Sequence, residues 1–224
     1  MKLLAIETAT DSCSVALLRG DDVLEVFHDA PRQQTEQVLP MVQQLLVQQG
    51  VTLAELDAIA CGHGPGAFTG VRVAVSVTQG LAFAAGLPVI GVSTLQALAL
   101  DILADADPQP VLAALDARLG ELYLGVYQRD EEGGLRALLP DSLHAPGALP
   151  DFPAGIRRGG GSGDVWLEPL RDAVPALEWV PGRRARAAHV ARLAALQLAR
   201  GETLSAEALQ PLYLRDRVIQ GAVR

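Results

Sequence analysis

The chain opens with short apolar runs separated by polar turns. Runs at residues 2–7, 12–18 and 23–28 predict three consecutive antiparallel strands. The first two are joined by Glu7-Thr8-Ala9-Thr10-Asp11, a polar hairpin rich in hydroxyls and carboxylates. Three such strands, followed by helices and further strands, predict a mixed sheet covered by helices, which is an α/β architecture.

A helical period follows these strands. Apolar residues recur at spacings of three and four from 35 to 49, and Gly50 stands where a left-handed residue commonly ends a helix. The pattern predicts a helix with one apolar stripe. This stripe consists of Val38, Met41, Val42, Leu45 and Leu46.

A second helix, predicted over 71–85, has a different pattern. After Arg72 it carries no charged residue, and its valines, leucines and Phe83 are distributed around it. A helix that is apolar on every side must be covered on every side. One face can pack on the sheet. The opposite face needs a neighbour from another chain, or a second layer within the same domain.

The first half closes with two more strands and a helix. Apolar runs at 56–61 and 87–92 predict buried strands, and Ser93 or Thr94 caps a helix over 94–104. The Pro- and Asp-containing stretch 105–110 reads as a linker. Two lobes are therefore expected, 1–105 and 106–224.

The second lobe restarts with strands. These are predicted at 111–115 and 121–128, with a turn at 133–134 and short elements over the Pro- and Gly-rich stretch 140–182. A last amphipathic helix is predicted over 187–200. The extended tail beyond it is free to pack back on the first lobe.

A glycine-rich loop, Gly62-His63-Gly64-Pro65-Gly66-Ala67-Phe68-Thr69-Gly70, joins the strand at 56–61 to the uncharged helix. Its four glycines indicate that backbone comes very close to something. A strand, a glycine turn and a helix N-terminus together can form an anion site, because amide N–H groups converge there. The alternative is a tight connection without a ligand. It is not a Walker loop, since the only lysine is Lys2, and it does not match the dinucleotide fingerprint.

Charge argues against autonomous nucleic-acid binding. The 224 residues carry a net charge of −8, with −7 in residues 1–105 and −1 in 106–224. Phosphate neutralisation needs clustered Lys or Arg. The nearest candidate, Arg183-Arg184 with Arg186, is interpreted as a solvated loop before a helix rather than a tRNA cradle.

The cysteines and the apolar runs indicate in which cellular compartment the protein is expected. Cys13 and Cys61 lie in apolar strand-like runs and are interpreted as small buried hydrophobes, with no disulfide or metal spacing. The longest apolar stretch, 81–92, is broken by Gly86 and Pro88 and is not expected to span a bilayer. The start of the chain has no charged-then-apolar signal pattern. We expect a cytoplasmic protein with no membrane partner.

No self-sufficient catalytic set is visible. The four histidines are scattered, and His63, the one inside the glycine loop, is interpreted as an exposed loop side chain. The serines lack a nucleophile-elbow context. Glu7, Asp11 and Asp116 each end a strand, where they could hold a hydrated Mg²⁺ near a phosphate or serve as turn caps. We predict no catalytic residue and no metal site.

Taken together, these segments resemble the YeaZ/TsaB family of bacterial proteins across both lobes. The matching pieces are Leu4-Ala5-Ile6-Glu7-Thr8-Ala9-Thr10, Cys13-Ser14-Val15-Ala16-Leu17, Leu39-Pro40, the loop Gly62 to Arg72, Gln79-Gly80-Leu81-Ala82, Pro88-Val89-Ile90-Gly91-Val92-Ser93-Thr94-Leu95, Asp116-Ala117-Arg118 with Glu121 and Tyr123, and Pro211-Leu212-Tyr213-Leu214-Arg215.

The resemblance implies an actin-like ATPase fold of the sugar-kinase and Hsp70 type. It implies a role in forming N6-threonylcarbamoyladenosine at position 37 of tRNAs that read codons starting with A. A larger paralogue, TsaD, would carry the catalysis, and a small ATPase, TsaE, would join them. ATP and Mg²⁺ would be used by the complex and not bound by this chain alone, and tRNA would be met only through the complex.

Departures from the catalytic paralogue agree with this. Where the resemblance places the paralogue's two metal-binding histidines, this chain has Thr94 and Leu98, which cannot replace imidazole. Ala117 and Arg118 follow Asp116 and crowd the space that a nucleotide would need. A vestigial phosphate or nucleotide site is expected at Glu7, Thr8, Gly64, Gly66, Asp116 and Gly160.

The first two helices are predicted to dock on the equivalent helices of the paralogue, and to self-associate as a homodimer in its absence. The alternative function is an independent ATP-dependent enzyme, a kinase or ATPase of the same fold. A protease ranks last because no Ser/His/Asp or metal set is visible. The residues predicted for the docking seam are Met41, Leu45, Val71, Val75, Thr78 and Ala82.

Overall fold

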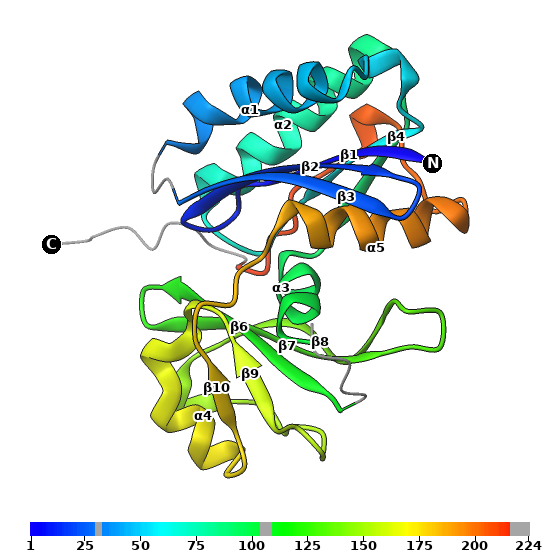
Figure 1. Ribbon diagram of the computed structural model, residues 1–224. Coiled ribbons are helices and arrows are strands. Elements are labelled where there is room, and N and C mark those ends of the chain that lie inside the picture. The colour runs from blue at the N-terminus through cyan, green and yellow to red at the C-terminus, as the bar shows by residue number, and fades with distance from the viewer. Residues whose placement is uncertain (30–32, 104–108, 216–224) are drawn as a thin grey trace, which may run out of the picture.

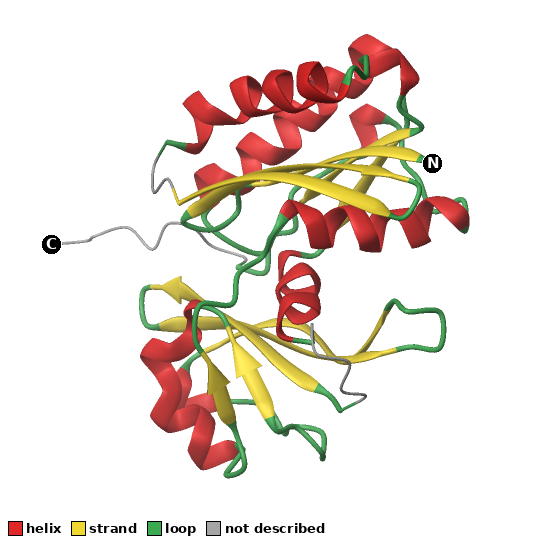
Figure 2. Ribbon diagram, viewed as in Figure 1, coloured by secondary structure: helices red, strands yellow, loops and turns green. Residues whose placement is uncertain are grey.

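The computed structural model describes residues 1–29, 33–103 and 109–215. It contains two five-stranded sheets with helices outside and between them (Figures 1 and 2). The predicted α/β class with two mixed sheets is therefore confirmed. The strands are β1 (Lys2–Glu7), β2 (Ser12–Arg19), β3 (Asp22–Asp29), β4 (Ala58–Gly62), β5 (Val89–Val92), β6 (Val111–Arg118), β7 (Glu121–Arg129), β8 (Leu135–His144), β9 (Arg158–Gly160) and β10 (Glu178–Val180).

Five α-helices lie within these ranges. Three of them lie close to the predicted bounds, and a fourth, short one lies within the Pro- and Gly-rich stretch. The helix predicted over 71–85 begins three residues earlier, within the glycine loop. They are α1 (Gln34–Gln49), α2 (Phe68–Ala85), α3 (Thr94–Ile102), α4 (Leu167–Ala173) and α5 (Ala187–Ala199).

The two sheets share one topology. The first has the order β3-β2-β1-β4-β5 and the second the order β8-β7-β6-β9-β10. In each sheet, the first three strands in the chain are antiparallel to their neighbours. The fourth strand pairs in parallel with the first, and the fifth pairs in parallel with the fourth. The same chain path is thus used twice.

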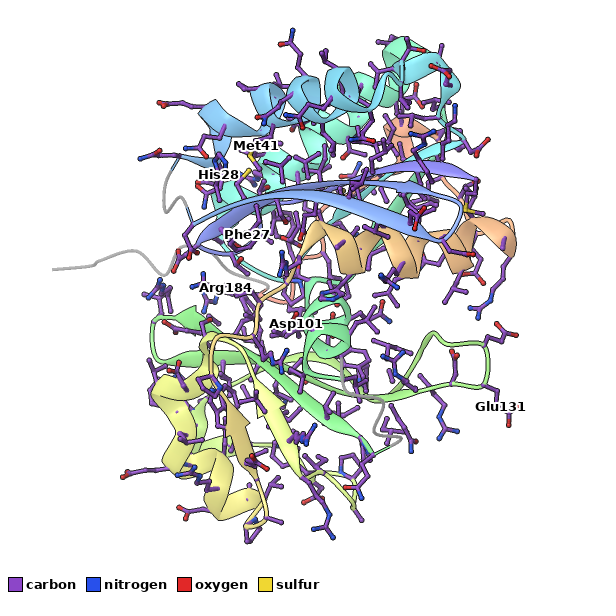
Figure 3. The ribbon with its side chains drawn as sticks, viewed as in Figure 1. Phe27, His28, Met41, Asp101, Glu131 and Arg184 are labelled. Atoms are coloured by element: carbon purple, nitrogen blue, oxygen red, sulfur yellow. The ribbon has the colours of Figure 1, made fainter. Side chains whose placement is uncertain are left out.

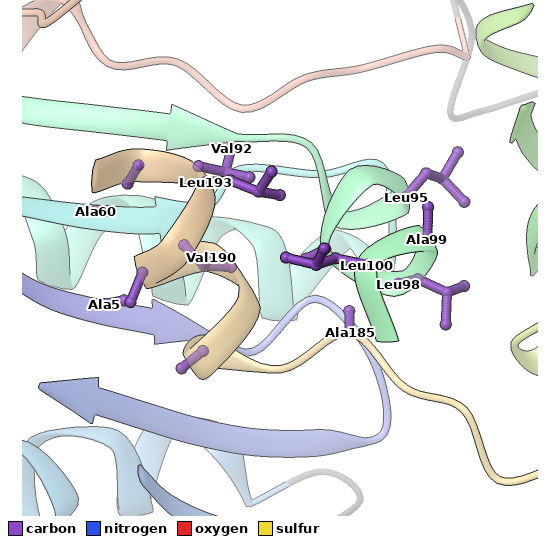
Figure 4. Packing of buried hydrophobic residues seen from close by; sticks show 14 of the residues in the cluster. Ala5, Ala60, Val92, Leu95, Leu98, Ala99, Leu100, Ala185, Val190 and Leu193 are labelled. Atoms are coloured by element: carbon purple, nitrogen blue, oxygen red, sulfur yellow. The ribbon is translucent and has the colours of Figure 1, made fainter. Parts of the chain in front are cut away.

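Alternating side chains assign the helices to the sheet faces. On β1, Leu4 and Ile6 face α1 and α2, whereas Leu3 and Ala5 face the core beside α5. The last of these contacts is visible in Figure 4, where Val190 and Leu193 of α5 lie over the sheet. Helices α3 and α5 therefore form a middle layer between the two sheets, and α4 covers the outer face of the second sheet.

The chain returns to the first lobe after β10. Helix α5 packs on β1, β2, β4 and β5, and its first amides are held by side chains of the first sheet. Ser14 Oγ accepts from Ala187 N at 2.8 Å, and Glu25 Oε1 accepts from Ala188 N at 3.0 Å. Helix α5 thus packs on the first lobe, although the sequence placed it in the second. The tail was expected to be free to pack back on the first lobe, and Leu204 and Leu209 do contact it. The predicted boundary at 105 lies outside the described residues.

Candidate functional site

The glycine loop packs against the hairpin that follows β1. A Cβ at Gly66 would lie 2.3 Å from the carbonyl oxygen of Ala9, and a Cβ at Gly70 would lie 2.0 Å from that of Thr8. Ala67 N donates to Ala9 O at 2.7 Å, and Thr8 Oγ1 donates to Gly70 O at 2.7 Å. The close approach that the glycines predicted is therefore made to the chain's own backbone. Of the two interpretations, this favours the tight connection.

Glu7 lies beneath this loop and is fully buried. Its carboxylate accepts from Ala9 N at 2.6 Å and from Thr94 Oγ1 at 3.4 Å. Burial raises the pKa of Glu7 to about 7, and these hydrogen bonds only partly offset the effect. A carboxylate enclosed in this way is not an open Mg²⁺ ligand, so of the two alternatives for Glu7 the turn cap is favoured.

A cleft of about 480 Å³ opens between the lobes. Its size is typical of small-molecule sites. Of the six predicted phosphate-site residues, only Gly66 and Asp116 line it, whereas Glu7 and Thr8 are buried below and Gly160 belongs to β9. Gly64 is likewise covered, since a Cβ there would meet Leu212 O at 2.8 Å. The lining comes from 9–11, 66–68, 71, 115–119, 123, 161–162, 164, 182–185 and 212–215.

Asp116 is already engaged inside this cleft. Its carboxylate accepts from Arg118 N at 2.8 Å and pairs with the Arg118 guanidinium at 2.9 Å. Arg118 and Leu119 both have positive φ angles, of 61° and 53°, so the turn after β6 bends the arginine back over the aspartate. A Mg²⁺ ion at Asp116 would have to displace that guanidinium.

His63 is not the exposed loop side chain that the sequence suggested. It is partly buried, and its Nδ1 lies 3.1 Å from the carbonyl oxygen of Gln210. Burial lowers its pKa, which favours the neutral imidazole at pH 7. Across the described ranges, no group of three His, Cys, Asp or Glu side chains could hold a metal ion.

A buried polar cluster joins the lobes near His63, and sequence reasoning missed it. Asp141 of β8 accepts from Ser93 Oγ at 2.5 Å and from the hydroxyl of Tyr127. Burial raises the pKa of Asp141. Ser93 also caps α3, accepting from Leu95 N at 3.1 Å. The cap was predicted, but its acidic partner was not, because β8 itself was not predicted.

The arginine cluster is paired with the first lobe. Arg184 lies 2.6 Å from Asp29, and its amide donates to Asp101 at 3.1 Å. Arg186 lies 2.5 Å from Glu25 and 4.9 Å from the ring centre of Phe27. Figure 3 shows Arg184 and Asp101 between the lobes. The interpretation of this cluster as a simply solvated loop is wrong, because it ties the approach to α5 onto the first sheet.

The two cysteines are free and buried, as predicted. Burial raises the pKa of Cys13 to about 11 and that of Cys61 to about 12. The thiolate is the reactive form of cysteine, so both side chains stay protonated and unreactive at neutral pH.

The predicted docking seam faces inward. Its side chains are all buried within the monomer, and Met41 lies between α1 and the first sheet (Figure 3). Their apolar character reflects packing on the sheet, so the choice of these residues needs correction. The six residues are Met41, Leu45, Val71, Val75, Thr78 and Ala82.

Other residues of the same helices form the exposed face. On α1, Leu39 is 50% exposed and Val47 is 73% exposed, and on α2 Phe83 is 73% exposed. Between Phe83 and the start of α2 the exposed positions follow the i, i+4 spacing of one helix face. We call this the α2 stripe; it consists of Phe68, Thr69, Arg72, Ser76, Gly80, Phe83 and Ala84.

Helix α2 is also the one element in the described part of the chain that is long and apolar enough to cross a bilayer by length and composition. Its inner face packs on β4 and on α1. The helix is therefore covered on one side by its own lobe, and its other side exposes Phe68, Phe83 and Ala84 among small and polar residues.

Comparison with known proteins gives consistent findings. The model of the family described as TsaD, tRNA N6-adenosine threonylcarbamoyltransferase, matches residues 28–154, which is more than half of the chain. The tRNA threonylcarbamoyladenosine biosynthesis protein TsaB of Escherichia coli (strain K12) is 37% identical over 224 residues, covering 97% of this chain and 96% of that protein. The Bacillus subtilis (strain 168) protein of the same name is 34% identical over 143 residues, covering 63% of this chain and 61% of that protein.

Solved structures agree over nearly the whole length. A structure described as YeaZ from Pseudomonas aeruginosa matches with a TM-score of 0.84 at 37% identity, covering 95% of this chain and 99% of that one. Another, described as an uncharacterized protein from the same organism with similarity to peptidase YEAZ, matches with a TM-score of 0.83 at 39% identity, covering 96% and 99%.

Proposed function

Because the chain belongs to the TsaB/YeaZ family of tRNA threonylcarbamoyladenosine biosynthesis proteins, we propose that it is the non-catalytic, essential subunit that binds and activates the catalytic paralogue TsaD. The product would be N6-threonylcarbamoyladenosine at position 37 of tRNAs that read codons starting with A. The actin-like ATPase fold expected from the motifs fits the TsaD-type family match and the YeaZ neighbours.

The observation that carries this proposal is the set of large apolar side chains exposed on α1 and α2. Val47 and Phe83 are each 73% exposed, Leu39 is 50% exposed and Phe68 is 43% exposed, although all four lie on helices whose inner faces are packed. Exposed apolar side chains that gather on one face commonly mark an interaction site. The α2 stripe has small residues, Ser76 and Gly80, next to Phe83, which leaves room for a partner helix to approach closely.

A paralogue is the partner that fits this face best. The TsaD family model itself matches this chain from 28 to 154, a range that includes α1 and α2. Two chains with equivalent helices can pack those helices around a pseudo-two-fold axis. In the absence of the paralogue, the same face would pair two copies of this chain as a homodimer.

We expect a contact of standard size. A standard interface buries roughly 800 Å² per partner. Apolar area removed from water contributes about 25 cal/mol per Å², and this gain opposes the entropic cost of association. The free energy would come from burial rather than from charge, because the α2 stripe has Arg72 as its only charged residue.

Catalysis would then belong to the partners. Within this chain the cleft carboxylate Asp116 is ion-paired with Arg118, and we propose that no cofactor binds to this chain alone. ATP and Mg²⁺ would be used by the complex, which would include the ATPase TsaE, and tRNA would be bound only through it. We place this complex in the cytoplasm, with no membrane partner.

Substitution of Phe83 tests the docking face. Phe83→Glu places a carboxylate in the centre of the proposed contact, where desolvation of an unpaired charge is costly. We expect at least a ~100-fold weaker affinity for the paralogue, which corresponds to roughly 3 kcal/mol. Surface plasmon resonance with the purified paralogue measures this loss, and co-purification checks it.

The matched control is Val165→Glu, an apolar residue that is 65% exposed but lies on the second lobe, where affinity should stay unchanged. Both variants should keep the melting temperature of the wild type. A charge at Val75 would be a poor test, because Val75 is 4% exposed and its replacement would disrupt the core. An unchanged affinity of Phe83→Glu for the paralogue would contradict the proposal.

A further inference from the structure

The chain crosses between the lobes in residues 209–215, which we call the strap. It begins at Leu209, which is fully buried in the core under α2, and Gln79 of α2 donates to the Leu209 carbonyl at 3.0 Å. His63 then holds the strap twice: its Nδ1 lies 3.1 Å from Gln210 O, and its carbonyl accepts from Leu212 N at 2.8 Å. The first end is therefore fixed to the glycine loop and α2.

The middle of the strap is held by the first two turns of α2. The Arg72 guanidinium lies 3.5 Å from the ring centre of Phe68 and donates to the Tyr213 hydroxyl at 2.7 Å. The Phe68 and Tyr213 rings stack at 6.2 Å. These aromatic and cation–π contacts connect the strap to residues of the α2 stripe.

The far end of the strap is held by the second lobe. Arg215 pairs with Glu121 at 2.5 Å and donates to the carbonyl oxygens of Ala117 at 3.1 Å and Arg118 at 3.4 Å. These groups form the turn between β6 and β7. The Arg215 side chain is only 18% exposed, so this charge-assisted network is only weakly screened by solvent.

Between its two ends the strap forms one wall of the cleft, through Leu212, Tyr213, Leu214 and Arg215. We infer that the strap fixes the angle between the lobes and keeps the cleft narrow, and that a partner docked on α2 acts on this angle through Arg72, Gln79 and Phe68. The second half of this inference rests on the proposed function, because it needs a partner on α2.

Arg215→Ala removes the strap's hold on the second lobe while leaving its first-lobe contacts in place. Local opening sets amide exchange rates, so we expect about tenfold faster hydrogen exchange at 117–121 and 212–215. A larger radius of gyration in small-angle scattering should accompany it. Arg215→Lys, which keeps the charge but loses the forked geometry, should fall between wild type and alanine.

The matched control is Arg136→Ala, which removes an arginine that donates to Gln128 within the second sheet. Its exchange rates at 117–121 and 212–215 should equal those of the wild type. Should Arg215→Ala fail to fold, Tyr213→Ala releases the middle of the strap from Phe68 and Arg72 without touching the ion pair, and it should give the same increase at 212–215. Wild-type exchange in every folded strap variant would overturn the inference.

A second arm adds the purified paralogue to the wild-type chain. If docking acts on the strap, exchange of the Leu212 amide should slow by at least threefold on saturation. Unchanged exchange in a complex that demonstrably forms would refute the link to docking. Failure of the complex to form would instead count against the proposed function, and the exchange of the free variants would still decide the role of the strap.

Discussion

The Glu7 carboxyl is buried at the end of β1, and burial raises its pKa to about 7 from 4.5. Between these values the folded state keeps the proton on Glu7 and the unfolded state loses it. The folded state then binds more protons, so the free energy of unfolding falls as pH rises from about 4.5 to 7. The fall attributable to Glu7 should be about 3 kcal/mol, since each pH unit corresponds to roughly 1.4 kcal/mol.

Glu7→Gln isolates this effect, because glutamine keeps an oxygen acceptor for the Ala9 amide and does not titrate. Denaturant unfolding at several pH values should show wild type losing stability relative to the variant from pH 4.5 to 7, with no further change above that range. Glu131→Gln, an exposed carboxyl at the turn after β7 (Figure 3), is the control and should run parallel to wild type. Parallel curves for Glu7→Gln would contradict the prediction.

Individual residues differ in how far the sequence could place them. Cys13 and Cys61 were correctly predicted as buried, because each lies in an apolar run and such a run indicates a strand in the core. Met41 and Val75 were assigned to an outer face and lie inside. Hydrophobicity shows that a side chain is buried, but not whether its own lobe or a partner buries it. The position of the His63 side chain could not be predicted, because its Nδ1 contacts the carbonyl oxygen of Gln210, 147 residues further along the chain.

At the scale of elements, the two glycines of α2, Gly70 in its first turn and Gly80 further along, have opposite surroundings. A Cβ at Gly70 would lie 2.0 Å from Thr8 O, whereas a Cβ at Gly80 would meet nothing within 4 Å. Gly70→Ala should therefore destabilise the fold by about 2–3 kcal/mol through forced separation of the helix and the hairpin. Gly80→Ala should stabilise by about 0.5–1 kcal/mol, because alanine is the better helix former.

Thermal and denaturant unfolding of both variants measure this contrast. The same substitution in the same helix removes differences of chemistry, so only the environment of the glycine can separate the two results. Equal changes in the two variants would mean that the hairpin and α2 do not pack as closely as the structure shows.

Most elements could be predicted from local signals, and one long strand could not. Helix α1 ends at Gly50 in the left-handed conformation, and Ser93 caps α3, both as expected from the sequence. Strand β8 was missed because Pro140 interrupts it and two register shifts occur in its pairing with β7. Proline is tolerated there because β8 is at the edge of its sheet. A bulged edge strand loses the alternation that identifies strands.

For the whole molecule, the same sheet order in both lobes places the β1–β2 and β6–β7 hairpins on opposite sides of the cleft. The order of strands and helices along the chain was enough to predict a mixed sheet with helices in each lobe. The return of α5 to the first lobe was not, because it depends on Ser14 and Glu25 meeting the helix N-terminus over long sequence distances. The cleft therefore has walls from both ends of the chain.

This construction leads to a prediction about nucleotides. Arg118 is paired with the Asp116 carboxylate at 2.9 Å and the strap forms one wall of the cleft, so the Mg²⁺ of ATP would have to displace the Arg118 guanidinium at Asp116 and the nucleotide has less room. Calorimetric titration of the isolated chain with ATP and Mg²⁺ should show no saturable binding at micromolar concentrations. An independent ATP-dependent enzyme requires the reverse: micromolar binding and turnover that Asp116→Ala abolishes while Asp164→Ala, at another position of the cleft wall, does not. That pattern would make the chain a catalyst rather than a docking subunit, because it would show that Asp116 leaves Arg118 to hold the Mg²⁺ of a bound nucleotide.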